Sequence, residues 1–457
     1  MSERDRLREL DRTAVWHAFS QMSEYDGLII DRAEGCWLTD IEGRRIFDGA
    51  SSLWCNLFGH RVPEIDRAII EQLGQVAHVT NLGMSHPTTI RLAERLLSHA
   101  VRGLKHVFFA GDGASAVEVA MKMAFQYWQQ KRKPESGRTK FLALGDAYHG
   151  DTLGTVSVGG VSLFQKRFEP LLFEVLRGPC PDNYRRPAGM DESEACAHYL
   201  DAYRRLLDRH HREVVAVIAE SCIQGAAGFV MQPKGFLAGL HRLCKDFGAL
   251  LILDEIAVGM GRSGKMFAFE HEEVKHEESD VRIEPDFLCL GKGLTGGYLA
   301  MSATLTSERI WESFLGGFED RKTFYHGHTF GGNPLAAAAG NAVLDLLERE
   351  DCLGRIQEKG TGLAGVLGCL ANHPHVGEVR QLGMLAAVEI VEGKSSRTRF
   401  DWRKRAGKKF CDWMLGRGVW LRPLGDVVPV LPPLGISTEE FDFLEEIFSD
   451  FPAEFLE

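Results

Sequence analysis

The sequence predicts an α/β protein in which helices cover both faces of a mostly parallel sheet, with a second, smaller α+β domain. Two observations support this fold class. Short apolar segments of strand length alternate with segments of helical periodicity through the middle of the chain. The 457 residues are also enough to bury a large core and to form more than one domain.

Six segments have the length and composition expected of buried strands, because they are short, apolar and rich in β-branched residues. The candidates are Lys105–Ala110, Lys140–Leu144, Val214–Glu220, Ala249–Asp254, Asp286–Leu290 and Ala300–Thr304. Helical segments separate several of these strands, which is the arrangement expected of a parallel sheet.

Helices are expected at Ser115–Gln130, at Phe236–Phe247 and from Pro334 to Leu347. In the first of them, apolar residues recur at helical spacing, which predicts a face packed in the core and not a cofactor site. These residues are Val117, Ala120, Met121, Ala124, Phe125 and Trp128.

Beyond residue 347 the pattern becomes more mixed and ends in an acidic helix near Thr438–Ser449. We therefore predict a large domain over residues 64–325. A small domain would be built from both ends of the chain, residues 1–63 and 326–457.

The composition is that of an ordinary enzyme, with 44% hydrophobic and 26% charged residues. The formal net charge of −11 argues against nucleic acid as a partner. No apolar run is long enough to span a membrane, and Met1–Arg12 lacks the apolar core of a secretory signal. The ten cysteines are scattered, which predicts free thiols and a cytoplasmic location.

One segment, Glu270–Glu284, is dense in Glu, Lys and His, which predicts a solvated surface loop without a catalytic role. His271 and His276 could bind a metal in principle. No third ligand at an ordered spacing accompanies them, so no metal site is predicted.

Two acidic residues, Asp254 and Glu255, end a buried apolar strand. Such a pair is costly unless something partners it. One interpretation is a cap on the following loop. The other is a carboxylate that faces a cationic heterocycle at the carboxyl edge of the sheet, where ligands bind in open α/β sheets. This segment alone leaves both open.

Lys292 lies between Gly291 and Gly293, directly after the strand Asp286–Leu290. Glycines at a strand end let the backbone approach a ligand closely. The three residues alone are a weak signal, and the spacing of a phosphate-binding P-loop is missing. Together with Asp254 they become informative, because pyridoxal phosphate requires a lysine for its Schiff base and a partner for its pyridinium nitrogen.

Two further segments fit such a cofactor. Gly111-Asp112-Gly113-Ala114-Ser115 stands between a strand and a helix, where backbone N–H groups and the helix N-terminus can hold a phosphate. Tyr148, in Tyr148-His149-Gly150, follows the strand Lys140–Leu144. Its flat ring could stack on the cofactor, although a core tyrosine is the plainer interpretation of this residue alone.

Together, these motifs resemble those of the fold-type I, class III aminotransferases along nearly the whole chain. The resemblance is carried by Asp254-Glu255-Ile256, Gly259-Met260-Gly261-Arg262-Ser263-Gly264, Gly291-Lys292-Gly293, His326-Gly327-His328-Thr329-Phe330 and Gly332-Asn333-Pro334-Leu335. Within the class, the chain is most similar to the branch that aminates 8-amino-7-oxononanoate in biotin biosynthesis. That likeness is carried by Trp16-His17, Asp48–Trp54, Val119–Trp128, Tyr148–Thr152 and Leu421–Gly425.

The resemblance implies roles for the matched residues. Lys292 would hold pyridoxal 5′-phosphate as a Schiff base and move a proton, Asp254 would pair with the pyridinium nitrogen, and Tyr148 would stack on the ring. Gly113 and Ala114 would bind the phosphate, and Gln224 would lie near the phenolic oxygen. Thr329 would reach the phosphate of a neighbouring subunit, so that the active unit is a homodimer. The substrate pocket would contain Phe19, Leu53, Trp54, Gly327 and Arg422.

Arg422 would grip the distal carboxylate of a small-molecule substrate in bidentate fashion, which a lysine could not match. A surface ion pair is the alternative for this arginine. Pro423 and Gly425 in a turn favour a fixed position in the pocket.

The chain departs from the family pattern at two places. Asp112 stands where serine is common, and a carboxylate beside a phosphate would weaken binding unless it points away or caps the helix. Phe19 and Leu53 stand where the branch that uses S-adenosylmethionine has a tyrosine and a tryptophan. Between S-adenosylmethionine and lysine, this difference favours lysine as the amino donor.

Two other interpretations stay open. Another class III enzyme, such as an ω-amino-acid transaminase or a racemase, would keep the cofactor residues and differ in the pocket. A non-catalytic binding protein on the same fold is disfavoured by the presence of Asp254, Lys292 and Tyr148 together.

Overall fold

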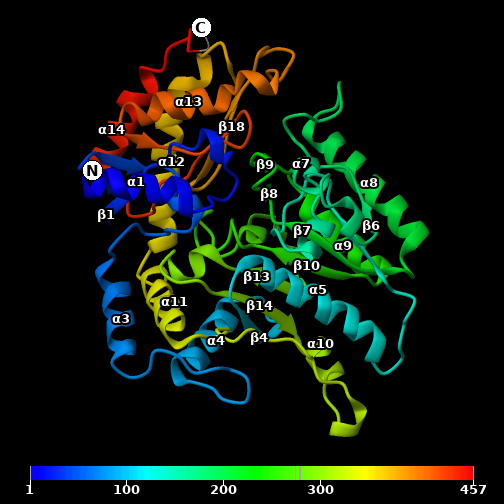
Figure 1. Cartoon of the computed structure of the whole chain (residues 1–457). Coiled ribbons are helices and arrows are strands. Elements are labelled where there is room, and N and C mark those ends of the chain that lie inside the picture. The colour runs from blue at the N-terminus through cyan, green and yellow to red at the C-terminus, as the bar shows by residue number, and fades with distance from the viewer. Residues whose placement is uncertain (1, 273, 277–278, 456–457) are drawn as a thin grey trace.

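The centre of the molecule is a seven-stranded sheet with the strand order β4-β14-β13-β10-β7-β5-β6 (Figure 1). The structure is a computed structural model that describes residues 2–272, 274–276 and 279–455. The strands are β4 (Leu104–Ala110), β5 (Lys140–Ala143), β6 (Val175–Arg177), β7 (Val214–Glu220), β10 (Leu250–Asp254), β13 (Phe287–Leu290) and β14 (Ser302–Ser307). All six predicted strands are present. The edge strand β6 was not predicted, because three residues show no periodicity.

The sheet is mostly parallel, as predicted. Strand β14 runs antiparallel to both of its neighbours, β4 and β13. The pairs from β13 through β10, β7 and β5 to β6 are all parallel. Since β4 and β13 are both antiparallel to β14, the carboxyl ends of β4, β5, β7, β10 and β13 share one edge of the sheet.

Alternate side chains of the central strands point to opposite faces and form two cores. Ile218, Ile252 and Cys289 pack with helix α5 (Gly113–Gln130) on one face. The other face belongs to a larger core, in which Val217 and Leu251 lie together with residues of three further helices. These are α8 (Glu192–His210), α9 (Phe236–Phe247) and α11 (Pro334–Leu347).

Helix α5 tests the predicted core face. Val117, Ala120, Met121, Ala124 and Trp128 are buried, as predicted. The inclusion of Phe125 was wrong, because its side chain is 40% exposed. Phe125 lies beside the buried stripe and faces outward, since successive helical residues are about 100° apart.

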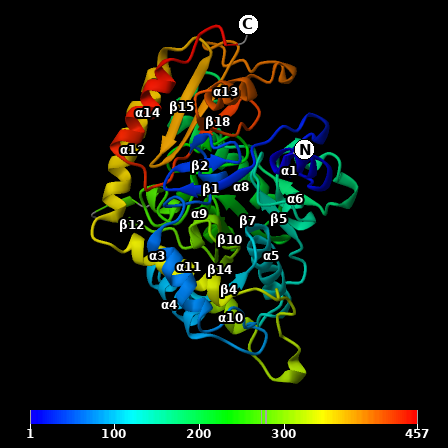
Figure 2. The ribbon, with the colours of Figure 1, turned by 60° about the vertical axis from the view of Figure 1, so that its left-hand side comes forward.

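Two smaller sheets lie beside the central one, and the first of them joins the ends of the chain. The first contains β1 (Ile30–Glu34), β2 (Trp37–Asp40), β3 (Arg45–Asp48) and β17 (Val419–Trp420), and β3 pairs in parallel with β17. The second contains β15 (Val376–Leu382), β16 (Leu385–Ile390) and β18 (Val427–Val430). Figures 1 and 2 show the blue N-terminal elements beside the orange and red C-terminal ones.

Helices from both ends surround these small sheets. They are α1 (Glu3–Ala14), α12 (Cys352–Gly368), α13 (Ala406–Leu415) and α14 (Thr438–Ser449), the last of which has the predicted bounds. Helix α11 instead packs against α3 (Pro63–Leu73) and α4 (Pro87–His99). The division of the chain at residues 64 and 326 stays a prediction.

The segment Glu270–Glu284 contains a hairpin of β11 (Val274–His276) and β12 (Ser279–Val281), where a loop was expected. Its start is anchored, since the Glu272 carboxylate accepts the N–H of Gly235 at 2.7 Å. His271 Nε2 lies 3.1 Å from the Ser263 carbonyl oxygen, whereas the side chain of His276 lies outside the described residues. No group of three or more potential metal ligands was found in the described part of the chain.

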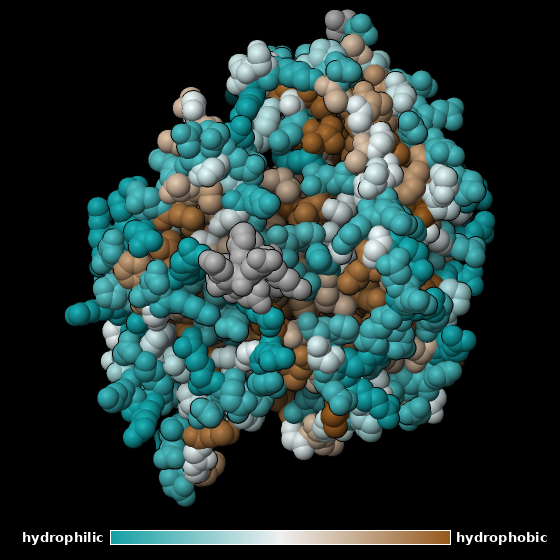
Figure 3. Space-filling model, turned by 180° about the vertical axis from the view of Figure 1, so that it is seen from behind, coloured by the Kyte–Doolittle hydropathy of each residue, from teal (hydrophilic) through white to brown (hydrophobic). Residues whose placement is uncertain are grey.

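The back face of the molecule is mostly hydrophilic, and its apolar side chains form scattered patches (Figure 3). None of the helices in the described ranges is long and apolar enough to cross a membrane. All ten cysteines are free thiols, and six of them are buried.

Candidate active site

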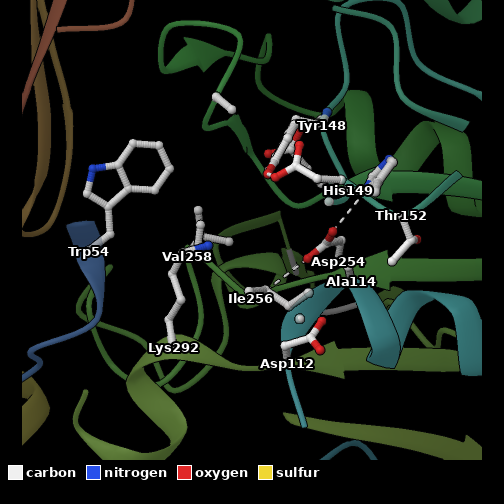
Figure 4. Close-up of a pocket in the computed structure, with 16 residues that line it drawn as sticks. Trp54, Asp112, Ala114, Tyr148, His149, Thr152, Asp254, Ile256, Val258 and Lys292 are labelled. Atoms are coloured by element: carbon white, nitrogen blue, oxygen red, sulfur yellow. Dashed lines mark hydrogen bonds and ion pairs between the residues drawn. The ribbon is translucent and has the colours of Figure 1, made fainter. Parts of the chain in front are cut away.

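A cavity of about 510 Å³ opens at the carboxyl edge of the central sheet. Six of the predicted site residues line it, and Figure 4 shows most of them around one space. The six are Trp54, Gly113, Ala114, Tyr148, Asp254 and Lys292. They come from segments far apart in the sequence, which the sheet brings together as its strands end.

The acidic pair at the end of β10 divides into two roles. Asp254 faces the cavity, where its Oδ2 lies 2.8 Å from His149 Nδ1 and its Oδ1 accepts the N–H of Ile256 (Figure 4). The Glu255 carboxylate turns away and accepts the N–H groups of Ala268 and Phe269 at 2.7 and 2.8 Å. Glu255 thus binds the following loop, as one interpretation expected, whereas the pairing of Asp254 with a cationic heterocycle stays a prediction.

Lys292 follows β13 directly and has a left-handed φ of 41°. Its Nζ lies 5.6 Å from the centroid of the Trp54 ring and makes no hydrogen bond within the described residues. Burial lowers the pKa of Lys292, although the negative charges of Asp254 and Glu220 act in the opposite direction. The neutral amine needed for attack on a carbonyl is therefore more accessible than at a surface lysine.

The predicted phosphate turn lies at the N-terminus of α5. Asp112 is the N-cap of this helix: its carboxylate accepts the Ser115 N–H at 2.9 Å and the Ser115 hydroxyl at 2.8 Å. The N–H groups of Gly113 and Ala114 belong to the first turn and have no partner within the helix. A Cβ at Gly113 would lie 2.9 Å from Ile256 Cγ2, so a side chain there would crowd the turn.

Tyr148 brings an aromatic ring to the cavity. Its hydroxyl donates to Asp151 Oδ2 at 2.8 Å, and burial raises the pKa of Tyr148, so the phenol stays protonated. The ring packs edge-on against Phe164 at a centroid distance of 5.8 Å.

Glu220 was not among the predicted site residues, although it lines the cavity. It ends β7, and its carboxylate accepts the N–H groups of Tyr148 at 3.0 Å and Gly225 at 2.7 Å. Burial raises its pKa to about 7. The signal that drew attention to Asp254, an acidic residue closing a buried strand, was equally present at Glu220.

His149 also received no role from the sequence. Its ring is buried, and while Nδ1 pairs with Asp254, Nε2 has no hydrogen-bond partner among the described residues. The only sequence signal was its place in Tyr148-His149-Gly150.

The predicted substrate residues lie beside the cavity. Phe19 and Arg422 line a neighbouring cavity of about 690 Å³, and Leu53 lines another of about 550 Å³ that Arg422 also borders. Arg422 Nη2 donates to the backbone oxygens of Ala18 and Phe19 at 3.4 and 3.3 Å. The Phe19 ring reaches Phe164, with 5.4 Å between centroids, and through it the Tyr148 ring.

Three other predicted residues lie outside the lining of this cavity. Gln224 is buried and its Nε2 donates to the Gly145 carbonyl at 2.8 Å. Gly327 and Thr329 are exposed in the segment before α11. The predicted roles of these three residues are not tested by a single chain and stay predictions.

The residues around the cavity fit pyridoxal phosphate. Around one space stand the Lys292 amine, which has no hydrogen-bond partner among the described residues, a carboxylate held by His149, a glycine turn at a helix N-terminus and a flat phenol. These are the groups that such a cofactor requires for its aldehyde, ring nitrogen, phosphate and ring face.

Comparisons with known proteins agree with this site. The family model for class III aminotransferases matches residues 20–451. A protein of Geobacter sulfurreducens, named adenosylmethionine-8-amino-7-oxononanoate aminotransferase, is 44% identical over 442 residues, which cover 96% of this chain and 95% of the relative.

Two solved structures resemble the whole fold. The Methanocaldococcus jannaschii protein of the same name has a TM-score of 0.89 at 38% identity, covering 98% of this chain and 99% of that one. An amine transaminase from an uncultivated Pseudomonas species, solved in its PLP-bound form, has a TM-score of 0.88 at 33% identity, covering 95% and 97%. The chain therefore belongs to the class III aminotransferases, which use pyridoxal phosphate as cofactor.

Proposed function

We propose that this enzyme transfers an amino group to 8-amino-7-oxononanoate and so makes 7,8-diaminononanoate for biotin biosynthesis. The observation that carries the proposal is the 44% identity to a relative named for this acceptor, over nearly the full length of both proteins. Similarity of this extent includes the segments that supply Trp54 and Arg422. The proposed reaction involves small-molecule substrates and no nucleic acid.

The chain's own residues would carry the proton movements. Bound pyridoxal phosphate supplies an electron sink that stabilises negative charge at the carbon bearing the amino group. Lys292 Nζ would remove the proton from that carbon and donate it to C4′ of the cofactor. The lowered pKa of Lys292 favours the neutral amine that this step needs. Asp254, oriented by His149 and the Ile256 N–H, keeps a proton on the ring nitrogen.

On the substrate side, Arg422 would bind the carboxylate at the far end of the acceptor. Its guanidinium borders both neighbouring cavities. A long methylene chain could then lie along the apolar rings of Phe19 and Phe164 toward Tyr148. The resulting pocket binds a substrate with a carboxylate at one end and the reacting carbonyl group near the other.

The donor is S-adenosylmethionine or lysine. Phe19 and Leu53 favour lysine, whereas the relatives named for adenosylmethionine favour that donor. Purified enzyme given 8-amino-7-oxononanoate with each donor in turn, with diaminononanoate measured by mass spectrometry, decides between them. Strict dependence on S-adenosylmethionine would contradict the prediction from Phe19 and Leu53.

The same assay tests the acceptor. We expect diaminononanoate only when 8-amino-7-oxononanoate, a donor and pyridoxal phosphate are all present. The second candidate is a broader amine transaminase, which the likeness to the Pseudomonas structure favours. Faster turnover of ω-amino acids or simple amines with pyruvate than of 8-amino-7-oxononanoate would establish that candidate instead.

We also propose that the active unit is a homodimer in the cytoplasm, with Thr329 acting in the partner's site. Thr329 is exposed and lies outside the cavity of its own chain, and exposed apolar side chains surround its segment. They include Leu82, Met84, Tyr325 and Phe330.

Mixed dimers test this arrangement. Lys292→Ala and Thr329→Ala proteins are each expected to be inactive or weakly active, but a mixed dimer would contain one site with both native residues. The two variants are mixed, unfolded together and refolded. Recovery of activity in the refolded mixture supports the homodimer. Absence of recovery, with mixed dimers present by native mass spectrometry, contradicts a shared site.

A further inference from the structure

Four consecutive residues near the active site have left-handed backbone conformations. The φ values of Ser51, Ser52, Leu53 and Trp54 are 47°, 46°, 72° and 70°, and none of these residues is glycine. Residues other than glycine rarely adopt this region even singly, because Cβ crowds the following carbonyl. A left-handed turn of this length persists only where surrounding contacts hold it.

The contacts that hold the turn centre on Asp48, the last residue of β3. Its side chain is fully buried, and its Oδ1 accepts the N–H of Ser52 at 2.9 Å. Its Oδ2 accepts the Ser52 hydroxyl and the His60 Nε2–H, each at 2.9 Å. Ser52 is therefore bound through both its backbone and its side chain.

A second layer orients this carboxylate. Asn56 Nδ2 lies 3.1 Å from His60 Nδ1. Because the amide nitrogen can only donate, His60 Nδ1 accepts, and the ring proton lies on Nε2, where it is donated to Asp48. The Ser51 hydroxyl donates to the Leu431 carbonyl at 2.6 Å, which ties the start of the turn to the small domain.

The turn sends neighbouring side chains into different cavities. Trp54 lines the cavity that contains Lys292 and packs edge-on against Phe229 at 5.1 Å between centroids. Leu53 lines the cavity bordered by Arg422. A right-handed or extended backbone would point these two side chains in other directions.

We propose that Asp48 is a positioning residue of this aminotransferase: by binding Ser52 it holds the left-handed turn that presents Trp54 to the cavity of Lys292 and Leu53 to the neighbouring cavity that Arg422 borders. Asp48 touches no substrate itself. The inference rests on the proposed function only for the identity of the acceptor.

The test compares Asp48→Ala with Asp40→Ala in the holoenzyme. Asp40 is a matched control, because it is also buried, ends a strand of the same sheet and accepts two backbone N–H groups, from Glu42 and Arg44. The hydrogen bonds of its carboxylate within the described residues go to Glu42 and Arg44, whereas Asp48 binds Ser52 of the turn. Both variants are expected to lower the melting temperature to a similar degree.

The two variants should differ in kinetics. We expect Asp48→Ala to raise KM about tenfold or more for the acceptor and for the donor, with a smaller change in kcat, because misplaced contacts weaken substrate binding. Asp40→Ala should leave KM unchanged. Equal changes of KM in the two variants would overturn the proposal. Should Asp48→Ala fail to fold, Asp48→Asn, which keeps one acceptor oxygen, makes the same comparison.

A rescue separates backbone conformation from general damage. Glycine adopts positive φ without crowding, so Ser52→Gly added to Asp48→Ala should lower KM again. No recovery in the double variant overturns the role of the turn. Because the donor half-reaction is followed by the absorbance of the bound cofactor, these outcomes stand even where 8-amino-7-oxononanoate proves not to be the acceptor.

Discussion

The cofactor side and the substrate side of the site are built in different ways. On the cofactor side, Asp254, Glu220 and Lys292 each stand at or just beyond the end of a strand of one sheet. On the substrate side, Phe19, Trp54 and Arg422 come from three segments of the small sheets and their flanks, and none continues a strand of the central sheet. The central sheet thus positions the cofactor-side residues, while irregular backbone shapes the space for substrate.

The two sides also differ in their electrostatics. Buried carboxylates dominate the cofactor side, and burial raises the pKa of Glu220 and lowers that of Lys292. The substrate side has aromatic rings and charged side chains of both signs, among them Arg422, whose guanidinium is bonded to backbone oxygens. Changes on the cofactor side should therefore alter chemistry and stability, whereas changes on the substrate side should alter KM.

The largest effect is expected at Lys292. Lys292→Ala should bind pyridoxal phosphate noncovalently and lose turnover by roughly 10⁴-fold, because no other lysine of the described residues lines the cavity where the proton must be moved. Absorbance spectra and a diaminononanoate assay measure the two properties. Lys359→Ala is the control, since this half-buried lysine also has a lowered pKa but bonds to the Leu434 carbonyl instead. Retained turnover in Lys292→Ala would remove the lysine from the mechanism.

Glu220 should make stability depend on pH. In the folded protein its pKa is about 7, whereas an unfolded glutamate ionises near 4.5. The unfolded state binds fewer protons between these values, so the stability that Glu220 contributes falls as the pH rises from about 4.5 to about 7. Relative to Glu220→Gln, the wild-type apoenzyme should lose on the order of 3 kcal/mol across this window.

Urea unfolding of both apoenzymes from pH 4 to 8 measures the difference. Titrating groups that do not interact with Glu220 are common to both proteins, so their contributions cancel. A difference in unfolding free energy that does not vary with pH would show that Glu220 ionises normally in the folded state.

Arg422 tests the substrate side. Arg422→Ala should raise the KM of the acceptor about 10–50-fold and leave kcat nearly unchanged, because a charge-assisted pair contributes mainly to binding. Arg422→Lys should recover only part of this, since lysine lacks the bidentate fork. Arg399→Ala, in the same cavity, is the control. An unchanged acceptor KM in Arg422→Ala would mean that this arginine only braces residues 18 and 19.

The smallest effect is expected at Asp112. Because its carboxylate caps α5 through Ser115, Asp112→Ser should keep a cap and remove a negative charge near the phosphate turn. Pyridoxal-phosphate affinity should stay within about threefold of wild type or improve, since N-cap exchanges among Ser and Asp are nearly neutral. Spectroscopic titration measures it, and a large loss of affinity would refute repulsion by Asp112.

Most of the central sheet and the residues of the cofactor side could be predicted from the sequence. Apolar segments locate the strands, and ligand-binding residues lie where the strands of an open α/β sheet end. Asp254 and Lys292 were found in this way, and Glu220 could have been. The left-handed turn at Ser51–Trp54 could not, since no glycine marks it and the contacts that hold it come from residues such as His60 and Leu431. Tertiary contacts override local preference there.

The antiparallel strand β14 has a consequence for the order of folding. Strand β4 joins the sheet only through β14, and the turn after β4 is bonded to the Ser302 hydroxyl, 190 residues later in the chain. A chain emerging from the ribosome cannot fix its phosphate-binding turn until residue 307 has been made, and until then β4 and β13 both have unpaired edges. Fragments that end before β14 should aggregate, and cofactor binding should appear only after residue 307 has been made.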